Sequence, residues 1–201
     1  MKAIILKKFE ELTKSSTPVE ARIKIFEYIR DIPYYLVPQI GDPSEWAASI
    51  IEAHKGSCSP KHYLMGILFA KCGIKVKYAT YSFKWDNQAV KYPDELKKLA
   101  RDCPVGYHVA CKADIDKRWV LVDATWDRAL IKAGFPVNMN WDGISDTKNA
   151  VISFEETIHE SLQGRLDFVK DKRKMISEKQ AAAYVQFIQK LNAWLEGLRN
   201  E

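Results

Sequence analysis

The chain has 201 residues, of which 47% are hydrophobic and 28% are charged. This length supports one domain with a substantial core, and the composition excludes a disordered or fibrous protein. The net charge of +5 is spread along the chain, and the densest basic run is KDKRK at residues 170–174. Such a run is more typical of a solvated helix face than of a nucleic-acid surface, so we expect no nucleic-acid partner.

The sequence carries no obvious targeting or membrane signal. No apolar run approaches the ~20 residues that a membrane helix needs, and the N-terminus lacks the apolar run and cleavage site of a signal peptide. We therefore expect a cytoplasmic protein without membrane contact, in which the four cysteines are reduced thiols. Their irregular spacing, without a CxxC pair, argues against a zinc ribbon.

Two helices are predicted before the first cysteine. The run TPVE at residues 17–20 is a capping box with proline in the first helical position, and the apolar stripe that follows ends at Pro33. The run DPSE at residues 42–45 repeats the same start signal, and Gly56 ends the second helix.

A third helix is predicted to begin at Cys58 and to end before Gly73. Ser57 can serve as its N-cap, and Pro60 is tolerated in its first turn. The segment is apolar on nearly every side, which predicts a central, buried helix.

Strands are predicted in the middle of the chain. Residues 74–83 are rich in β-branched and aromatic side chains, and residues 107–113 and 118–125 form a hairpin joined by DIDK. Residues 84–104 are polar and indicate a surface insertion, with a short helix over residues 93–101.

The C-terminal third is predicted to be loop followed by helices. Residues 127–152 lack a clear period, which is typical of a loop. The runs SFEE at 153–156 and SEKQ at 177–180 are capping boxes that predict two helices. The predicted organisation is a single domain over residues 1–201, with a core at 17–126, a loop at 127–152 and C-terminal helices at 153–200.

The hairpin register predicts a histidine and an aspartate in contact. A turn centred between Ile115 and Asp116 places His108 directly opposite Asp123, where Cβ atoms lie ~4.5–5.5 Å apart. A carboxylate at that distance can fix the tautomer of the imidazole and leave its second nitrogen free to act on a thiol. A slip of one residue would place the two side chains on opposite faces.

Cys58 can supply that thiol. At the first turn of a helix, it meets the positive end of the helix dipole, which lowers a thiol pKa and favours the thiolate. The free amides there, including its own, can stabilise an oxyanion. The pattern therefore predicts a Cys58–His108–Asp123 catalytic triad.

These residues resemble the transglutaminase-like superfamily, which has a papain-like catalytic core. Gly56-Ser57-Cys58 matches its nucleophile motif, Tyr107-His108 its base, Trp119 its strand aromatic, and Asp123-Ala124-Thr125 its aspartate. Order and spacing agree over about residues 20–126. The resemblance implies an α+β fold in which helices pack on a small antiparallel sheet, with extra C-terminal helices here.

The resemblance also implies cysteine-dependent acyl transfer or amide hydrolysis through a thioester, on a peptide or protein substrate. It requires no cofactor and no metal, and it leaves the substrate and the oligomeric state open. Relatives often complete the oxyanion hole with a side chain upstream of the cysteine, for which the candidates are Tyr34, Tyr35, Gln39 and Trp46. His62 and Trp141 are candidates for the wall of the cleft.

Other interpretations of the same residues stay open. Cys58 could be a buried structural thiol, since free cysteine is among the most buried residue types. His54, Cys58 and His62 are four residues apart and would share one face of a continuous helix as metal ligands, although Gly56 and Pro60 interrupt it. Asp127 could replace Asp123 as the orienting acid. The alternative function is a catalytically silent transglutaminase-like module that binds a peptide.

Overall fold

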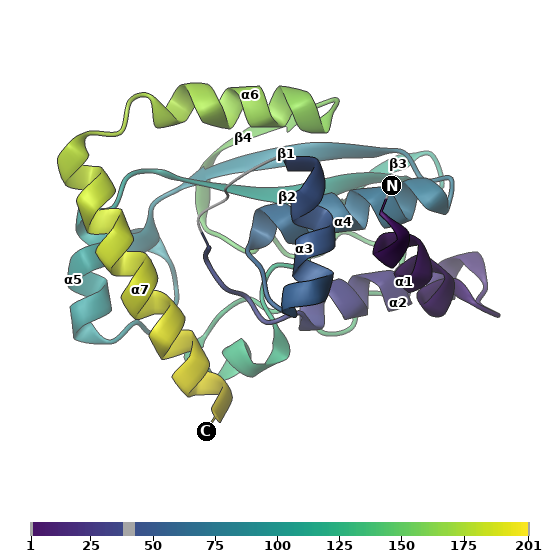
Figure 1. Ribbon diagram of the computed structural model, residues 1–201, viewed down its shortest axis with the longest axis horizontal. Coiled ribbons are helices and arrows are strands. Elements are labelled where there is room, and N and C mark those ends of the chain that lie inside the picture. Colours follow the sequence, from purple (N-terminus) through teal and green to yellow (C-terminus); the bar gives the residue numbers. More distant parts are fainter. Residues whose placement is uncertain (1, 38–42, 201) are drawn as a thin grey trace.

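The computed structural model describes residues 2–37 and 43–200, and these form helices packed on an antiparallel sheet (Figure 1). Within them, four strands pair in the order β3-β2-β1-β4. The prediction of an α+β fold with a small antiparallel sheet is confirmed. The strands are β1 (Val76–Phe83), β2 (Gly106–Ile115), β3 (Arg118–Val122) and β4 (Ser153–His159). The α-helices are α1 (Ala3–Thr13), α2 (Pro18–Asp31), α3 (Pro43–Ala53), α4 (Cys58–Lys71), α5 (Asp94–Asp102), α6 (Leu162–Arg173) and α7 (Glu178–Asn200). Short 3-10 turns lie at η1 (Trp85–Asn87) and η2 (Arg128–Ala133).

Helices cover both faces of the sheet. Helix α4 packs on β2 and β1 from below in the view of Figure 1, with α1, α2 and α3 around it, and α6 lies along the opposite face. Helix α7 crosses the end of the sheet and packs on α5 and η2. The C-terminal helices thus cover the outside of the core, as the sequence predicts.

The central position of α4 follows from its composition. Leu64, Met65, Leu68 and Phe69 are fully buried, and the helix is apolar on nearly every side. Each such side chain contributes about 1.5–3 kcal/mol by leaving water. The first residue of this helix is Cys58, so the thiol is attached to one of the most rigidly packed elements of the fold.

The hairpin of β2 and β3 has a register that differs from the predicted one. Ile115 pairs with Arg118 and Cys111 with Val122, and the turn residues Asp116 and Lys117 have φ of 51° and 63°. The predicted turn would have required a positive φ at Ile115, which a β-branched residue resists. The predicted register is therefore wrong, and every partner moves by two residues. A two-residue shift keeps side chains on the same face.

The segment at residues 153–159 is a strand, so the helix predicted from the SFEE run is wrong. Strand β4 pairs with β1, and the two glutamates of the run bind its neighbour instead of capping a helix. Ser82 donates to Glu155 at 2.9 Å, and the Tyr81 hydroxyl donates to Glu156 at 2.7 Å. The helix starts only after Ser161, whose Oγ accepts a hydrogen bond from the Gly164 amide.

The other helix starts are close to prediction. Thr17 and Glu20 form the capping box of α2, and Ser177 and Gln180 bond reciprocally at the start of α7. Ser57 occupies the N-cap position of α4, but its side chain makes no capping hydrogen bond. Asp42 lies outside the described residues, and α1 was not predicted.

The supposed surface insertion at residues 84–104 contributes to the core. Trp85 and Leu96 are buried, and the Trp85 ring lies 5.0 Å from that of Phe187 on α7. The segment thus anchors the C-terminal helix.

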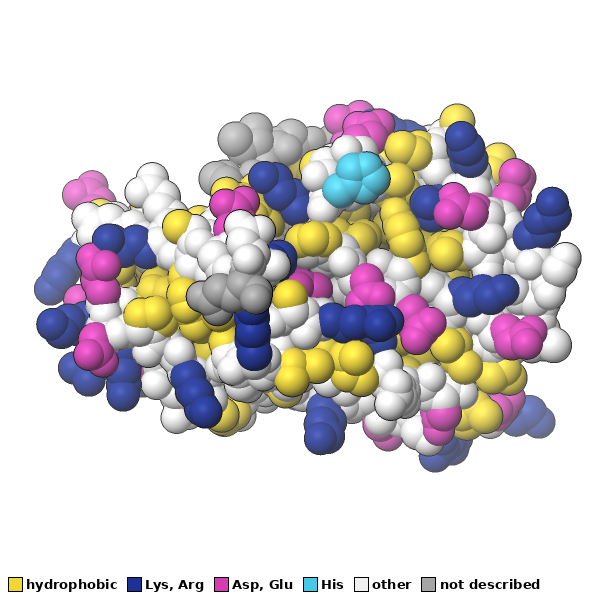
Figure 2. Space-filling view, turned by 90° about the horizontal axis from the view of Figure 1, so that it is seen from below, with side chains coloured by type: hydrophobic (Ala, Val, Ile, Leu, Met, Phe, Trp, Pro, Cys, Tyr) yellow, Lys and Arg dark blue, Asp and Glu magenta, His cyan; other side chains and the backbone are white. Residues whose placement is uncertain are grey.

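Acidic and basic side chains are interspersed over the surface seen in Figure 2. Among the described residues, no helix is long and apolar enough to cross a membrane.

Candidate active site

The chain just before Cys58 is fixed by a short backbone bridge. The Gly56 amide donates to Pro33 O, and the Tyr35 amide donates to Gly56 O, both at 3.1 Å. A Cβ on Gly56 would lie 2.6 Å from Cγ2 of Ile50, so only glycine fits without displacing that side chain. This bridge brings Tyr34 beside the start of α4.

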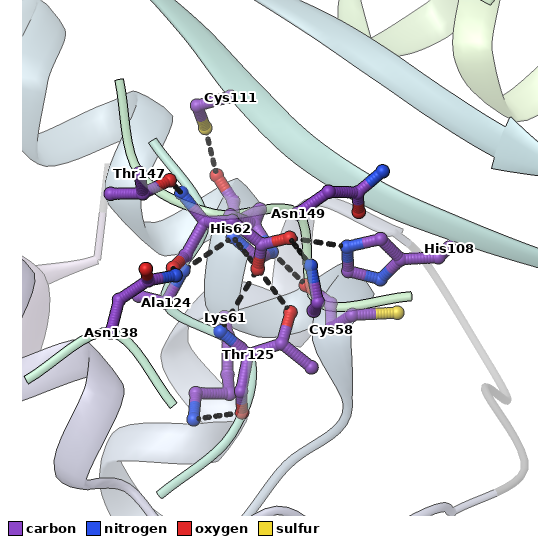
Figure 3. A network of polar contacts seen from close by, with 12 residues as sticks. Cys58, Lys61, His62, His108, Cys111, Ala124, Thr125, Asn138, Thr147 and Asn149 are labelled. Atoms are coloured by element: carbon purple, nitrogen blue, oxygen red, sulfur yellow. Dashed lines mark hydrogen bonds and ion pairs between the residues drawn. The ribbon is translucent and has the colours of Figure 1, made fainter. Parts of the chain in front are cut away.

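His108 and Asp123 are in direct contact. The His108 Nε2 lies 2.8 Å from Asp123 Oδ2, and both side chains are almost fully buried. Extending the observed register beyond the end of β3 at Val122 places residue 125 opposite His108, so Asp123, two residues earlier, is a diagonal neighbour on the same face. A carboxylate only accepts, so Nε2–H is the donor, and Nδ1 is the nitrogen turned toward the sulfur of Cys58 (Figure 3).

The Asp123 carboxylate accepts hydrogen bonds from several segments at once. Oδ1 accepts from the amide and the hydroxyl of Thr125, at 3.1 and 2.6 Å, and Oδ2 accepts from His108 and from the Ala150 amide at 2.8 Å. The two Thr125 bonds give a local reason for an Asp-x-Thr sequence. The carboxylate is therefore held in one orientation.

Burial and charge shift the titration of all three groups. Burial alone would raise the pKa of Asp123, but the positive charge and hydrogen bond of His108 lower it well below its usual range. Burial disfavours the charged imidazolium and would lower the pKa of His108. The Asp123 carboxylate and the Cys58 thiol together outweigh burial and raise this pKa. For Cys58, burial is outweighed by the hydrogen bond and charge of His108, which lower the thiol pKa. The arrangement favours a thiolate–imidazolium pair.

Two buried side chains of α4, Lys61 and His62, hold the start of this helix to the segment that follows Asp123. Lys61 Nζ donates to three carbonyls, Arg30 O, Ile32 O and Thr125 O, at 3.1, 2.9 and 2.7 Å. Burial lowers the pKa of Lys61 to about 7. This lysine thus ties the nucleophile helix to the segment that follows Asp123.

His62 links the same two segments. Its Nδ1 lies 2.9 Å from Cys58 O, and its Nε2 accepts from the Ala124 amide at 3.1 Å, so Nδ1 carries the proton. Burial lowers its pKa to about 4, which keeps the ring neutral. His62 is packed beneath the site and does not line the cavities above Cys58.

Two cavities reach Cys58. One is an aromatic cavity of about 60 Å³ that includes Tyr34, His108 and Trp126. The other is an open cavity of about 350 Å³ between the start of β2 and helices α6 and α7, which includes Tyr107 and Arg165. Both share Gly106, and a Cβ there would lie 2.4 Å from the Phe83 ring. The Cys58 thiol therefore borders both cavities.

The structure separates the candidates for the oxyanion hole and the cleft. Tyr34 lines the aromatic cavity with Cys58. Tyr35 lines neither cavity, and its ring lies under the Lys55 ammonium. Trp46 stacks on Tyr63 at 6.1 Å.

Trp141 borders a different cavity from those at Cys58. It is buried, its ring lies 5.1 Å from that of Phe26, and it borders a separate cavity formed by residues 138–148. It therefore does not line either of the two cavities at Cys58. Gln39 lies outside the described residues.

Asp127 and His159 have hydrogen-bond partners of their own, and His54 lies between two helices. Asp127 accepts from the Tyr34 amide and the Arg199 guanidinium, so it does not orient His108. His54 lies between α3 and α4 and is exposed. His159 is buried, and its Nε2 lies 3.1 Å from Oγ1 of Thr80.

A metal site formed by His54, Cys58 and His62 would require one continuous helix, but α3 ends at Ala53 and α4 starts at Cys58. In the described ranges, no cluster of three His, Cys, Asp or Glu side chains is close enough to hold a metal ion.

Sequence reasoning missed the partners of Asp123 that come from the loop at residues 127–152. Thr147 Oγ1 accepts from the Asp123 amide at 2.8 Å, and Asn138 donates to Asp123 O at 3.0 Å. With the Ala150 amide, they hold both the backbone and the carboxylate. The only signal was a polar loop rich in Asn and Asp after the motif, which carries no information about its contacts.

No family model and no curated protein matches the chain. Among solved structures, the chain is similar to a provisionally assigned cysteine protease from Cytophaga hutchinsonii, at 17% identity and a TM-score of 0.43. The match covers 78% of this chain and 49% of the other, so this chain corresponds to about half of that protein.

Proposed function

We propose that this protein hydrolyses or transfers the acyl group of peptide or protein amides through a thioester on Cys58, in a transglutaminase-like, papain-like core. The observation that carries the proposal is the alignment of three groups. The Cys58 thiol faces His108 at the start of a buried helix, and His108 is held by Asp123 at 2.8 Å. A thiolate beside an imidazolium is the reactive form of a cysteine nucleophile.

The reaction proceeds in two halves. In the first, the Cys58 thiolate attacks the amide carbonyl carbon, a C–S bond forms, and negative charge passes to the oxygen. The imidazolium of His108 then protonates the amide nitrogen, the C–N bond breaks, and the amine leaves. In the second half, neutral His108 removes a proton from water or an amine that attacks the thioester. The C–S bond then breaks, and Cys58 leaves as the thiolate.

We propose two donors for the oxyanion. The Cys58 amide is the first of α4, so helix geometry provides it with no intrahelical acceptor. Tyr34 lines the aromatic cavity together with Cys58, and we assign its phenol as the second donor. A correctly placed donor of this kind contributes about 3–4 kcal/mol to transition-state stability.

The proposal is tested by trapping the acyl-enzyme. The protein is incubated with a library of peptide thioesters and activated esters, and intact-protein mass spectrometry is followed by peptide mapping. We expect an acyl adduct on Cys58 that hydroxylamine removes. Cys58→Ala should abolish the adduct, whereas Cys72→Ala should retain it, because burial raises the pKa of Cys72 and disfavours its thiolate.

The alternative, a silent peptide-binding module, makes the opposite prediction. Peptides would bind near Cys58, and no adduct would form on it at any pH from 6 to 9. That result would refute the acyl-transfer proposal.

A further inference from the structure

Arg165 is a buried cation with an incomplete set of partners. Its side chain on α6 is 3% exposed, Nη1 donates to the Tyr63 hydroxyl at 2.5 Å, and Nη2 donates to Tyr107 O at 3.3 Å. Its buried Nε has no hydrogen-bond partner. Within the described ranges, no carboxylate lies within ion-pair distance of this guanidinium. Because arginine stays charged in proteins, burying it without a counter-ion is costly.

This guanidinium borders the open cavity that contains Cys58. The cavity has a volume of about 350 Å³, which is enough for an amino-acid side chain and part of the adjoining backbone. A second cation, Arg173, lines it two helical turns farther along α6. The remaining wall is largely apolar, formed by Val169, Ile176 and Tyr184 among others.

The charged side chains that line this cavity are all of one sign. Among the described residues that line it, the charged side chains are Arg165 and Arg173, and none is acidic. Tyr107 connects the cation to the catalytic strand, because its carbonyl accepts from Arg165 and the next residue is His108. Burial raises the pKa of Cys58, and the positive charge of Arg165 helps to lower it, after the hydrogen bond and charge of His108 and the backbone hydrogen bond of Val109. The cation is therefore close enough to act on a group bound at the thiol.

We propose that Arg165 binds a carboxylate of the substrate, so that the preferred substrate is a peptide with an acidic group beside the reacting amide. The inference rests on the proposed function and names its substrate class. A carboxylate fits the guanidinium because only two of its five N–H groups have partners among the described residues, and two of the others can donate to it together in a charge-assisted bidentate pair. Either an internal Asp or Glu side chain or a C-terminal carboxylate offers this chemistry.

Binding to the Cys58→Ala protein tests the carboxylate site without any reaction. Isothermal titration calorimetry compares three peptides of one sequence: one with an internal Glu and an amidated end, its Gln counterpart, and the Gln peptide with a free C-terminal carboxylate. We expect one carboxylate peptide to bind at least about tenfold more tightly than the amidated Gln peptide. The tighter one identifies the source of the carboxylate.

Variants of Arg165 test the assignment to this residue. Added to Cys58→Ala, Arg165→Gln should remove the preference for the carboxylate, and Arg165→Lys should keep part of it, because the charge remains but the bidentate geometry is lost. Arg173→Gln, at an exposed position, should reduce it about two- to threefold by weakening the field of the cavity. The matched control is Arg101→Gln, an exposed arginine on α5 that does not line the cavity, which should leave it unchanged.

Equal binding of all three peptides, no measurable binding, or a preference that survives Arg165→Gln would overturn the inference. Should Arg165→Gln fail to fold, the Arg165→Lys and Arg173→Gln proteins decide, since an unaltered preference in both would equally overturn it. Acylation of the unmodified protein separates this result from the proposed function. If neutral and acidic esters acylate the protein at equal rates, only the carboxylate site is refuted. If the protein binds carboxylate peptides selectively but is not acylated, only the proposed chemistry is refuted.

Discussion

Among single residues, Asp123 does most to determine the geometry of the site. It orients His108, and in turn it is held by Thr125, Ala150 and Thr147. Its role can be separated from its shape, because asparagine has the same size and cannot act as a charged acceptor.

Asp123→Asn should raise the thiol pKa of Cys58. Without the carboxylate, the imidazolium of His108 loses its main stabilising charge, and the thiolate loses its partner in turn. We expect the midpoint of the rate–pH profile for iodoacetamide alkylation of Cys58 to lie below the ordinary ~8.5 in the unmodified protein, and to rise by about one unit or more in the variant. Peptide mapping assigns the label to each cysteine.

Cys103 and Cys111 serve as internal references in that experiment. Burial raises the pKa of each thiol, to about 12 for Cys103, so both should be alkylated far more slowly below pH 8. Labelling of Cys58 no faster than these two, or a midpoint unchanged by Asp123→Asn, would contradict the thiolate–imidazolium pair.

The sequence nominated Cys58, His108 and Asp123 as a group, but it did not determine how the last two meet. Residue types and chain order suffice to nominate them. The register depends on which two residues accept a positive φ in the turn, and the difference between Ile115 and Lys117 at that point was decisive. The contact survives because the error was an even number of residues, so the two side chains stay on one face.

At the level of elements, the start of α4 depends on the bridge at Gly56. Gly56→Ala should destabilise the protein by about 1–3 kcal/mol, because the new Cβ would overlap Ile50 and push the bridge apart. The same displacement should slow alkylation of Cys58. Urea denaturation measures the free energy of unfolding.

Gly197→Ala is the matched control for that change. This glycine lies on α7, and a Cβ there meets nothing within 4 Å. The control should gain about 0.5–1 kcal/mol from helix propensity. If the two substitutions changed the free energy of unfolding by similar amounts, the predicted effect of the overlap with Ile50 would be refuted.

Helix α7 is tied to the loop that carries Tyr34. Arg199 donates to both oxygens of Asp127, at 3.2 and 2.7 Å, and to Tyr34 O at 2.9 Å. Arg199→Gln leaves a buried carboxylate without its cation, so we expect a loss of about 3 kcal/mol in unfolding free energy. Thermal and urea unfolding check it.

The control on the same helix is Lys190→Gln. Lys190 pairs with Glu95 at 2.6 Å, but both side chains are largely in solvent, so the change should stay within about 0.5 kcal/mol. A loss in Arg199→Gln as small as in this control would show that the C-terminal helix does not brace the site.

Most elements could be predicted, and the exceptions have physical causes. Capping boxes predicted the starts of α2 and α7 because they are local. The same local pattern failed at residues 153–156, where pairing with β1 outweighs helix propensity. Residues 84–104 contain too few apolar side chains to predict burial, and Trp85 is buried only because α7 returns over it.

Across the whole molecule, the site is closed by segments that are distant in sequence. Arg165 reaches Tyr63 across 102 positions, and Arg199 reaches Tyr34 across 165. Such contacts arise from the topology of the chain, because no local pattern encodes them. The sequence therefore nominates Cys58, His108 and Asp123, but it does not predict the residues that shape the cavity and hold Asp123.

The burial of neutral His62 makes the stability of the whole molecule depend on pH. Its pKa is about 4 in the folded protein and about 6.5 in an unfolded chain. Between these values the unfolded chain takes up a proton that the folded protein refuses, so the free energy of unfolding falls as pH falls. The slope reaches about 1.4 kcal/mol per pH unit.

His62→Gln should remove most of that slope, because an amide can donate to Cys58 O or accept from the Ala124 amide without titrating. His108, whose pKa is raised, stays protonated in the folded protein and titrates as an ordinary histidine in the unfolded chain, alike in both proteins, and the carboxylates with lowered pKa act mainly below about pH 4. His159 also has a lowered pKa and stays in both proteins, so it cancels in the comparison. From pH 6.5 to 5, urea denaturation should show a loss about 1.5 kcal/mol larger in the unmodified protein than in the variant. Parallel curves would refute this role, and exposed His54→Gln should behave like the unmodified protein.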